Sequence, residues 1–309
     1  MTAIADDELL RLSEFGLLAE NAEQAGVTGP LPPVRRVEAG GISALQWGEE
    51  SPRVVFLHGG GQNAHTWDTV VVGLGVPALA VDLPGHGHSA WREDGDYSPQ
   101  NNAAAIAPVI DGLAPEAELV VGMSLGGLTA IGLGAIAPQL VRELVLIDVT
   151  PSAMKRVSDM TKEQQGTVAL LQGEREFPSF ESILAITTAA APHRDRKSLR
   201  RGVFHNTRQL DNGNWTWRWD TIREFPDFDR LWDDVSGLSV PVRLVRGGES
   251  PFVTDEDAHE LAGRAQQFQG VRTVQNSGHS VQSDQPLVLT EILRGVLAGE
   301  SPPAPTVGA

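Results

Sequence analysis

The sequence predicts an α/β fold with a mostly parallel, doubly wound sheet. Short apolar runs of strand length alternate with longer helical segments along the chain, which is typical of strands joined by crossover helices. The pentapeptide GMSLG at residues 122–126 follows the apolar run 119–121 and precedes a helical stretch at 128–137, so it occupies a strand-to-helix turn. With 309 residues the chain is long enough for one large domain with an insertion.

The N-terminal region, residues 1–33, is predicted to form a helix and a connector. Apolar residues recur at helical spacing between residues 6 and 25, which indicates an amphipathic helix docked on the body. A proline-rich stretch at 29–33 then connects this helix to the body. At the other end, the prolines of residues 300–309 cannot continue a helix, so this segment is predicted to be a flexible tail.

Ser124, at the centre of the pentapeptide, is the candidate nucleophile. A serine on a sharp strand-to-helix turn is forced outward, with its hydroxyl exposed at the top of a sheet. Glycines at 122 and 126 avoid clashes in so tight a turn. The N-terminus of the following helix directs its partial positive charge to the place where an oxyanion would form. Taken alone, the pentapeptide also fits a glycine-rich turn with a surface serine.

Two other strand ends carry the groups that such a serine needs. The apolar run 54–57 leads into HGGG at residues 58–61, where glycines let backbone N–H groups face a ligand and supply a second oxyanion donor. Far downstream, His279 follows the strand-like run 271–275 and precedes a closing helix. A histidine after the serine in chain order, in a short loop at a strand end, is where the general base is expected.

These motifs, in this order, resemble those of the alpha/beta-hydrolase superfamily over roughly residues 34–298. The segment VDLPGHGHS at 81–89 is similar to the D-x-P-G-x-G-x-S segment after the family's fourth strand. Within the superfamily the chain looks most like intracellular bacterial serine carboxylesterases of the mycobacterial type. The resemblance implies an eight-stranded, mostly parallel sheet flanked by helices, with a helical cap inserted after strand six.

The resemblance also implies roles for individual residues. It makes Ser124 the nucleophile and His279 the base, and it assigns the oxyanion hole to the backbone amides of Gly60 and Leu125. It divides the chain into a core at 34–150 and 236–299 and a cap at 151–235. The cap range is where the alternation of strands and helices stops, and it holds four of the seven tryptophans.

The acid of the predicted triad is Asp148. Most relatives carry this carboxylate just after the seventh strand, but the residue at that place here is Ser250. Asp148 instead ends the apolar run 144–147, at the carboxyl end of a predicted parallel strand, where ligands bind in such sheets. Several branches of the superfamily carry their acid at this place.

Three other carboxylates remain alternatives for the acid: Glu249, Asp255 and Asp257. The two aspartates are better explained as the first turn of a helix capped by Thr254, because acidic residues there interact favourably with the helix dipole. Asp148 could also be a carboxylate that only caps the entry to the cap segment.

Candidate substrate-pocket residues are Gly61, Met123, His193, Trp215 and Trp217. Trp215, Trp217 and Trp219 alternate, which predicts an extended segment with one aromatic face. That face could form the wall of an acyl pocket or pack the cap against the body, and the sequence favours neither. His193 and His205 lie in the predicted cap, where positions on its surface are favoured.

Neither a metal nor a cofactor is expected. His86 and His88 have a spacing that could bind a metal, but the chain has no cysteine and no acidic residues clustered in a ligand pattern, so loop hydrogen bonds are favoured. The basic cluster at residues 194–201 is predicted to be a solvated helix face.

Composition narrows the class of partner. The net charge of −16 disfavours nucleic acid and anionic membranes, and no apolar run has the length needed to cross a bilayer. The N-terminal sequence is acidic and lacks the pattern of a signal peptide, which favours a cytoplasmic location. The expected partner is a small-molecule ester; the sequence predicts no oligomeric state.

The predicted function is that of a carboxylesterase-type serine hydrolase. Ser124 disfavours the haloalkane dehalogenases and epoxide hydrolases of this fold, which carry aspartate at the same turn. A carbon–carbon bond hydrolase, a lactonase or a thioesterase could use the same triad. A non-catalytic small-ligand receptor on a hydrolase scaffold is the alternative from another class.

Overall fold

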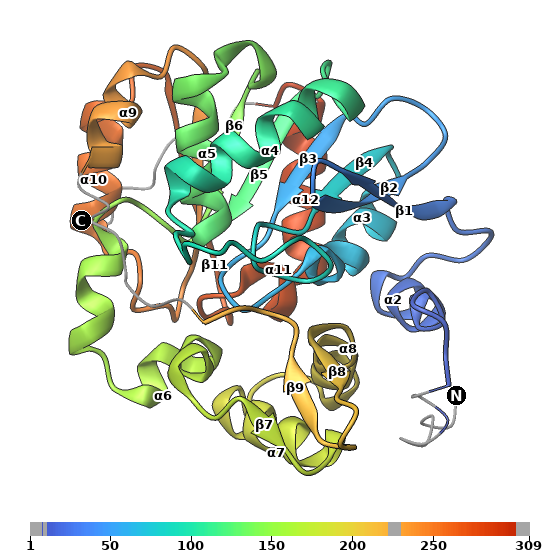
Figure 1. Cartoon of the computed structure of the whole chain (residues 1–309). Coiled ribbons are helices and arrows are strands. Elements are labelled where there is room, and N and C mark those ends of the chain that lie inside the picture. The colour runs from blue at the N-terminus through green and yellow to red at the C-terminus, as the bar shows by residue number, and fades with distance from the viewer. Residues whose placement is uncertain (1–7, 9–10, 222–229, 301–309) are drawn as a thin grey trace.

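An eight-stranded sheet forms the centre of the computed structural model, which describes residue 8 and residues 11–221 and 230–300 (Figure 1). The strand order is β1-β2-β4-β3-β5-β6-β10-β11. The first two strands pair in an antiparallel hairpin and β2 runs antiparallel to β4, whereas every other neighbouring pair is parallel. The strands are β1 (Val34–Ala39), β2 (Ile42–Trp47), β3 (Val54–Leu57), β4 (Ala78–Val81), β5 (Leu119–Met123), β6 (Leu144–Ile147), β10 (Val242–Gly247) and β11 (Phe268–Val274).

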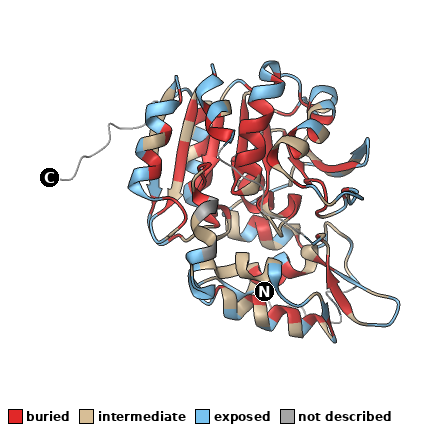
Figure 2. Ribbon diagram, turned by 60° about the vertical axis from the view of Figure 1, so that its left-hand side comes forward, coloured by how far each residue is buried: buried red, intermediate tan, exposed pale blue. Residues whose placement is uncertain are grey.

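Helices cover both faces of the sheet, which explains why its central strands are almost continuously apolar. Every residue of β3, β4, β5 and β6 is buried (Figure 2). One core lies between the sheet and the helices α4 (Pro99–Leu113), α5 (Leu125–Ile136), α9 (Leu231–Gly237) and α10 (Asp255–Arg264). The other lies under α3 (Asp68–Leu74) and α12 (Pro286–Leu297), with α2 (Leu18–Ala25) packed on α3.

The N-terminal helix is shorter than predicted. Glu8 is helical, residues 11–17 form turns and a bend, and α2 then covers the rest; residues 1–7 and 9–10 lie outside the described part of the chain. The reason is that contacts with the body hold this segment: Glu14 accepts hydrogen bonds from Arg36 and His65. Helical periodicity in the sequence does not register such long-range contacts. The predicted tail at 301–309 also lies outside the described residues.

The segment predicted as a cap lies below the sheet in Figure 1, beside the carboxyl ends of the parallel strands. It contains a three-stranded antiparallel sheet of order β7-β9-β8 in addition to helices, so it is not wholly helical. Its elements are η3 (Ala153–Asp159), α6 (Lys162–Gln165), η4 (Gly166–Gln172), β7 (Glu176–Phe177), α7 (Phe180–Ala190), α8 (Arg196–Asn206), β8 (Thr207–Gln209) and β9 (Trp215–Trp217). Residues 222–229 are not described.

The division of the chain at residues 151–235 stays a prediction, and packing suggests one adjustment at its end. The helix α9 contributes Leu231, Trp232 and Val235 to the core of the body and packs on α5. We therefore count α9 with the body rather than with the cap.

Candidate active site

Ser124 sits in a strained turn between β5 and α5. Its φ of 49° and ψ of −119° are unfavourable for a residue with a side chain, so the surrounding structure must enforce them. A Cβ atom at Gly122 would lie 2.4 Å from the carbonyl oxygen of Gly126, and one at Gly126 would lie 2.2 Å from the carbonyl oxygen of Leu57. Both positions therefore require glycine, and the pentapeptide is fixed by backbone packing rather than by surface-turn chemistry.

Asp148 and His279 are brought into direct contact. The Nδ1 of His279 lies 2.7 Å from Oδ2 of Asp148, whose side chain is fully buried. The other carboxylate oxygen, Oδ1, accepts a hydrogen bond of 3.0 Å from the backbone N–H of Gly247. Phe252 stacks on the imidazole, with 3.6 Å between ring centroids and 12° between planes. The ring is thus held on one face and at one edge.

The register of the sheet brings Ser124 to the same place. Met123 pairs with Ile147 at the ends of β5 and β6, so Ser124 and Asp148 are the next residues of two adjacent parallel strands. The backbone N–H of Ser124 donates to the carbonyl oxygen of Ile147 at 3.2 Å. The Nε2 of His279 is buried and has no hydrogen-bond partner among the described residues. An unpaired imidazole nitrogen with its opposite nitrogen on a carboxylate is the arrangement that accepts a proton from a serine.

The glycine loop lies against the serine turn. A Cβ atom at Gly59 would lie 2.5 Å from Sδ of Met123 and 3.3 Å from Cβ of Ser124. His58 anchors this loop: its Nδ1 donates to the carbonyl oxygen of Gly59, and its Nε2 accepts the N–H of Leu83. Burial, followed by the neighbouring His86, lowers the pKa of His58 to about 3, so the ring is neutral.

The two predicted oxyanion donors belong to these packed elements. Leu125 is the first residue of α5, where backbone N–H groups have no partner within the helix. Gly60 follows Gly59, the residue of the glycine loop that packs against the serine turn. The helix N-terminus and the glycine loop therefore approach Ser124 together.

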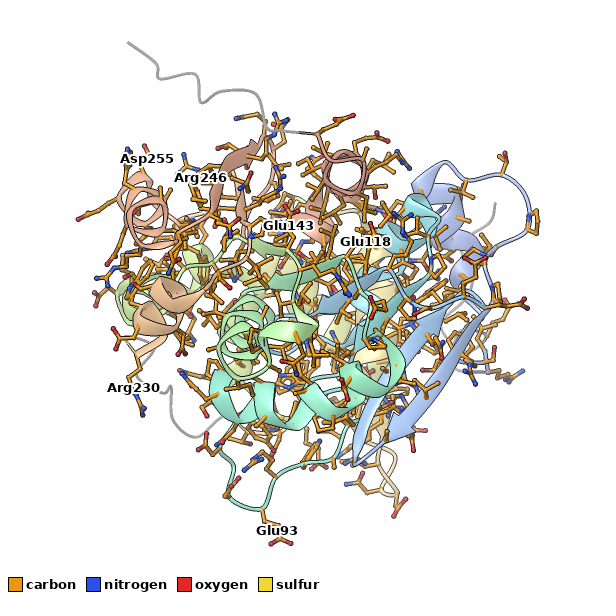
Figure 3. The ribbon with its side chains drawn as sticks, turned by 90° about the horizontal axis from the view of Figure 1, so that it is seen from above. Glu93, Glu118, Glu143, Arg230, Arg246 and Asp255 are labelled. Carbon is orange, nitrogen blue, oxygen red and sulfur yellow. The ribbon has the colours of Figure 1, made fainter. Side chains whose placement is uncertain are left out.

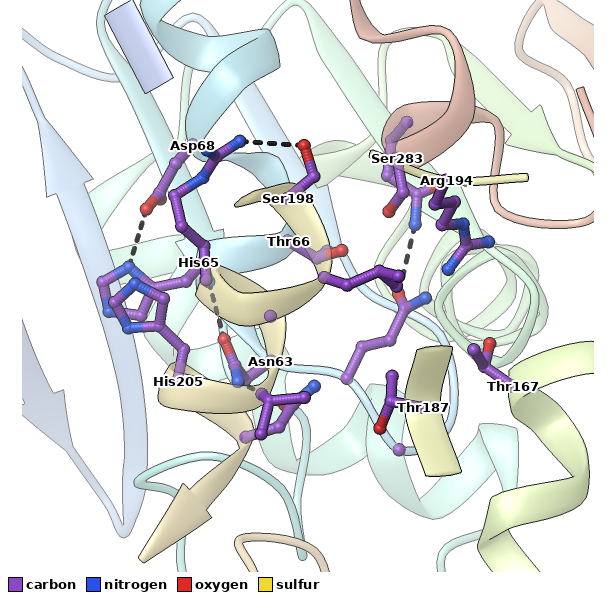
Figure 4. Close-up of a pocket in the computed structure, with 18 of the residues that line it drawn as sticks. Asn63, His65, Thr66, Asp68, Thr167, Thr187, Arg194, Ser198, His205 and Ser283 are labelled. Atoms are coloured by element: carbon purple, nitrogen blue, oxygen red, sulfur yellow. Dashed lines mark hydrogen bonds and ion pairs between the residues drawn. The ribbon is translucent and has the colours of Figure 1, made fainter. Parts of the chain in front are cut away.

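A cavity between the body and the predicted cap begins at the glycine loop. Gly60 and Gly61 line it, and Leu171 of the cap lies over both: Cβ atoms built at them would be 3.3 Å and 2.7 Å from Leu171. Trp217 and Trp219, stacked at 4.2 Å, form another part of its wall. Many of its other lining residues carry amide, hydroxyl or charged groups (Figure 4).

Three of the candidate pocket residues do not line this cavity. Met123 is buried beneath the glycine loop. Trp215 packs on Phe180 inside the cap. The side chain of His193 is 54% exposed and contacts Asp284.

A group of titratable residues lies at one side of the cavity, where Figure 4 shows His65, Asp68 and His205 together. Nδ1 of His65 lies 2.8 Å from Asp68 and its Nε2 lies 3.1 Å from Glu14. Burial disfavours charge on this ring, but Asp68 and Glu14 outweigh it and raise the pKa of His65 to about 9. His205 stacks on it at 3.7 Å, and burial, followed by the His65 charge, holds the pKa of His205 well below its usual range.

This group is the one place in the described part of the chain where three residues of metal-ligand type come within 4.8 Å of one another. Both nitrogens of His65 already contact carboxylates, and its ring is nearly parallel to that of His205, at 13°. The nitrogen lone pairs of two stacked rings lie in nearly parallel planes, so they do not converge on one metal ion. We therefore assign the group as a buried ion-pair cluster. The expectation that His205 lies on the cap surface is wrong.

The basic cluster at 194–201 is a solvated face only in part, at Arg196 and Lys197. Arg200 and Arg201 are buried and form ion pairs of 2.7 and 3.2 Å with Glu20 of α2. Arg194 binds the buried carboxylate of Asp284. The prediction is wrong for Arg194, Arg200 and Arg201 because their acidic partners lie on segments far away in the sequence.

The alternative acids have structural roles. Asp257 forms a reciprocal capping box with Thr254 and an ion pair with Arg156. Asp255 is 80% exposed and pairs with Arg246 on the surface (Figure 3). Glu249 is exposed. His86 is buried in its loop, with Nδ1 on the carbonyl oxygen of Pro84.

The strained serine turn, the histidine–aspartate pair and the parallel sheet are those of a hydrolase of the α/β class, and the comparisons agree. The model of the alpha/beta hydrolase family matches residues 54–292, most of the chain. The chain therefore belongs to the alpha/beta hydrolase family.

The chain is similar over nearly its full length to one curated protein, esterase Rv0045c of Mycobacterium tuberculosis. The identity is 71% over 294 residues, which cover 95% of this chain and 99% of the relative. A solved structure of that esterase has a TM-score of 0.87 at 72% identity and covers 93% of this chain and 99% of its own. A probable protein phosphatase methylesterase 1 of Caenorhabditis elegans is 27% identical and covers 79% of this chain and 68% of the relative.

A more distant structural likeness shows the fold alone. The thioesterase domain from the curacin biosynthetic pathway has a TM-score of 0.69 at 23% identity. The match covers 88% of this chain and 100% of that domain. Among the described residues, none of the helices is both long enough and apolar enough to cross a membrane.

Proposed function

We propose that this protein hydrolyses small to medium carboxylic esters through an acyl-enzyme formed on Ser124. The observation that carries the proposal is the contact of 2.7 Å between His279 and Asp148, which leaves Nε2 of the imidazole unpaired, while Ser124 and Asp148 follow two adjacent parallel strands. The 71% identity to a protein named as an esterase supports ester hydrolysis.

In this mechanism His279 takes the proton of the Ser124 hydroxyl as its oxygen attacks the ester carbonyl carbon. Asp148, buried and bonded to Nδ1, fixes the tautomer of the ring and stabilises the imidazolium that forms. The tetrahedral intermediate collapses when His279 gives its proton to the departing alkoxide, and the alcohol leaves. Water, deprotonated by the same imidazole, then attacks the acyl-enzyme and releases the acid.

The oxyanion formed in each half-reaction would be held by the backbone N–H groups of Gly60 and Leu125. These groups are fixed before the reaction because the glycine loop packs on the serine turn and Leu125 begins a helix. Loss of one such donor typically costs about 3 kcal/mol of transition-state stabilisation.

The acyl or alcohol group would occupy the cavity that begins at Gly60 and Gly61. Leu171 and Trp219 give this entrance an apolar wall, which suits a short alkyl chain. Because Leu171 belongs to the predicted cap, we include a cap that covers the site in the proposal. The proposal also includes two expectations from the sequence: a cytoplasmic location, and activity without nucleic acid, metals or cofactors.

A panel of fluorogenic esters with acyl chains of two to twelve carbons, run beside thioesters, lactones and a vinylogous diketone, tests the proposal. We expect the highest kcat/KM on short and medium esters, with the activity abolished in Ser124→Ala. Turnover of the diketone without turnover of esters would show a carbon–carbon bond hydrolase instead. Tight binding without turnover of any compound would show a receptor.

A further inference from the structure

A buried carboxylate that takes no part in the proposed chemistry joins the loop of the catalytic base to the cap. Asp284 ends the short helix α11 (Val281–Asp284), and its side chain is 1% exposed. Its Oδ2 accepts the backbone N–H of Gly278 at 2.9 Å. Its Oδ1 accepts Nε of Arg194 at 2.5 Å and lies 3.3 Å from Nε2 of His193. Both of these partners lie between α7 and α8 of the cap.

Gly278 is the residue directly before His279, so this hydrogen bond fixes the peptide that carries the base. The other side of the loop is fixed by β10: a Cβ atom at Gly247 would lie 2.1 Å from the carbonyl oxygen of Gly278. The N–H of Glu249 also donates to the carbonyl oxygen of Ser277 at 2.9 Å. The loop is therefore held between the end of the sheet and one carboxylate.

The charge of that carboxylate is compensated from the cap. Arg194, with a side chain that is 12% exposed, supplies the ion pair. A buried carboxylate that loses its cation is strongly destabilised and reorganises by protonation, by entry of water or by movement. Any of these changes would alter the hydrogen bond to Gly278 and hence the place of the imidazole, and a small misplacement of a catalytic group is costly.

We propose that Asp284 is a positioning residue which makes the alignment of His279 depend on Arg194 of the cap being seated. This inference rests on the proposed function. Displacement of the cap would move Arg194 away from Asp284 and leave the nucleophile poorly activated. A seated cap completes the series of contacts that runs from Arg194 through Asp284 and Gly278 to the base.

A second ion-pair contact of the cap provides a matched control. Glu20 of α2 receives Arg200 and Arg201 of α8 at 2.7 and 3.2 Å, so it also holds the cap to the body. It touches none of the loops that carry Ser124, Asp148 or His279 among the described contacts. Glu20→Gln should remove a cap–body ion pair of the same kind while Arg194 stays on Asp284, so the carboxylate that fixes Gly278 keeps its cation.

The test compares Arg194→Ala, Arg194→Lys, Asp284→Asn and Glu20→Gln by their rate of inactivation with a small alkyl fluorophosphonate. Arg194 lines the cavity, so a substrate could lose a direct contact with it. The small probe reports the reactivity of the serine–histidine pair instead. We expect Arg194→Ala and Asp284→Asn to slow inactivation about tenfold and to lower kcat more than they change KM. Arg194→Lys should recover part of the loss, and Glu20→Gln should lower Tm but keep the rate within about twofold.

If Arg194 and Asp284 act through the same series of contacts, the losses of inactivation rate in the two variants should not add. The Arg194→Ala/Asp284→Asn double variant should lose no more of the inactivation rate than either single variant. Because the double variant has no uncompensated carboxylate, it also replaces Arg194→Ala in the test if that variant fails to fold. Wild-type inactivation rates in Arg194→Ala, or in the double variant, would overturn the proposal. So would an equal loss in Glu20→Gln. If the wild-type protein itself does not react with the probe, the proposed function fails instead.

Discussion

Ser250 donates its hydroxyl hydrogen to Asp148 at 2.5 Å, on the same Oδ2 that receives Nδ1 of His279. Ser250 stands where most relatives are expected to carry the acid, and Asp148 approaches from the neighbouring strand β6. The two positions therefore converge on one point in space, and a carboxylate from either strand end could reach the imidazole. Ser250, at the usual place, donates a hydrogen bond to the carboxylate that we propose as the acid.

Replacing Asp148 by asparagine should lower kcat roughly 10⁴-fold with the fold intact. The amide keeps the shape of the carboxylate but offers the imidazole the wrong hydrogen-bonding partner, so the ring adopts the wrong tautomer. Steady-state kinetics at matched circular dichroism measure this effect. Asp255→Asn is the control and should leave kcat within about twofold, because Asp255 is a surface residue paired with Arg246. A lower kcat for Asp255→Asn than for Asp148→Asn would show that the acid lies in the loop after β10.

Ser250→Ala should lower kcat about tenfold and leave KM nearly unchanged. The change removes one hydrogen bond to a buried carboxylate, typically worth about 1.5 kcal/mol or more when one partner is charged, while Gly247 still binds the other oxygen. Steady-state kinetics on a short ester measure the effect. An undiminished kcat would mean that the hydroxyl only fills space.

His279→Ala should cost about as much activity as the loss of Ser124, because nucleophile and base act as a unit. His193→Ala, at a half-exposed cap position, should cost far less. The ratio of kcat/KM between the two variants is the measurement. A larger loss in the His193 variant would transfer the role of base to the cap.

The stability of the fold should fall at alkaline pH through His65. Its pKa in the folded protein is about 9, above its ordinary value of about 6.5, so the protonated ring stabilises the fold fully below pH 6.5. This contribution disappears as the pH rises through 9 and amounts to about 3 kcal/mol at most. Urea unfolding between pH 6 and 10 measures it, with His65→Gln as the control that should flatten the dependence. A wild-type free energy of unfolding that stays constant over this range would contradict the ion-pair cluster.

Much of the fold could be predicted because its strands are buried on both faces. The runs 54–57 and 144–147 coincide with β3 and β6, since each is an uninterrupted apolar stretch with a polar residue, His58 or Asp148, directly after it. The helix after Ser124 begins at Leu125, three residues before its predicted start, because the last two residues of the pentapeptide already belong to its first turn.

The remainder depends on contacts between segments that are distant in the sequence. Neither the partners of Arg200 and Arg201 nor the breaks in the N-terminal helix leave a local pattern, because Glu20 and Glu14 find their partners only in the folded chain. The alternation of Trp215 and Trp217 predicted an extended segment, and β9 is one. It could not indicate which ring lines the cavity, because that depends on where α7 packs.

The central claim is that Ser124 is the nucleophile and that His279 activates it, and active-site labelling tests it most directly. The wild-type protein, Ser124→Ala and His279→Ala are each treated with a fluorophosphonate probe, digested and analysed by mass spectrometry. Circular dichroism verifies the fold of His279→Ala. We expect one probe per chain, on the peptide that contains Ser124, with no labelling of Ser124→Ala and labelling of His279→Ala slowed by orders of magnitude. Full labelling of Ser124→Ala, or a probe attached to another residue of the wild-type chain, would contradict it.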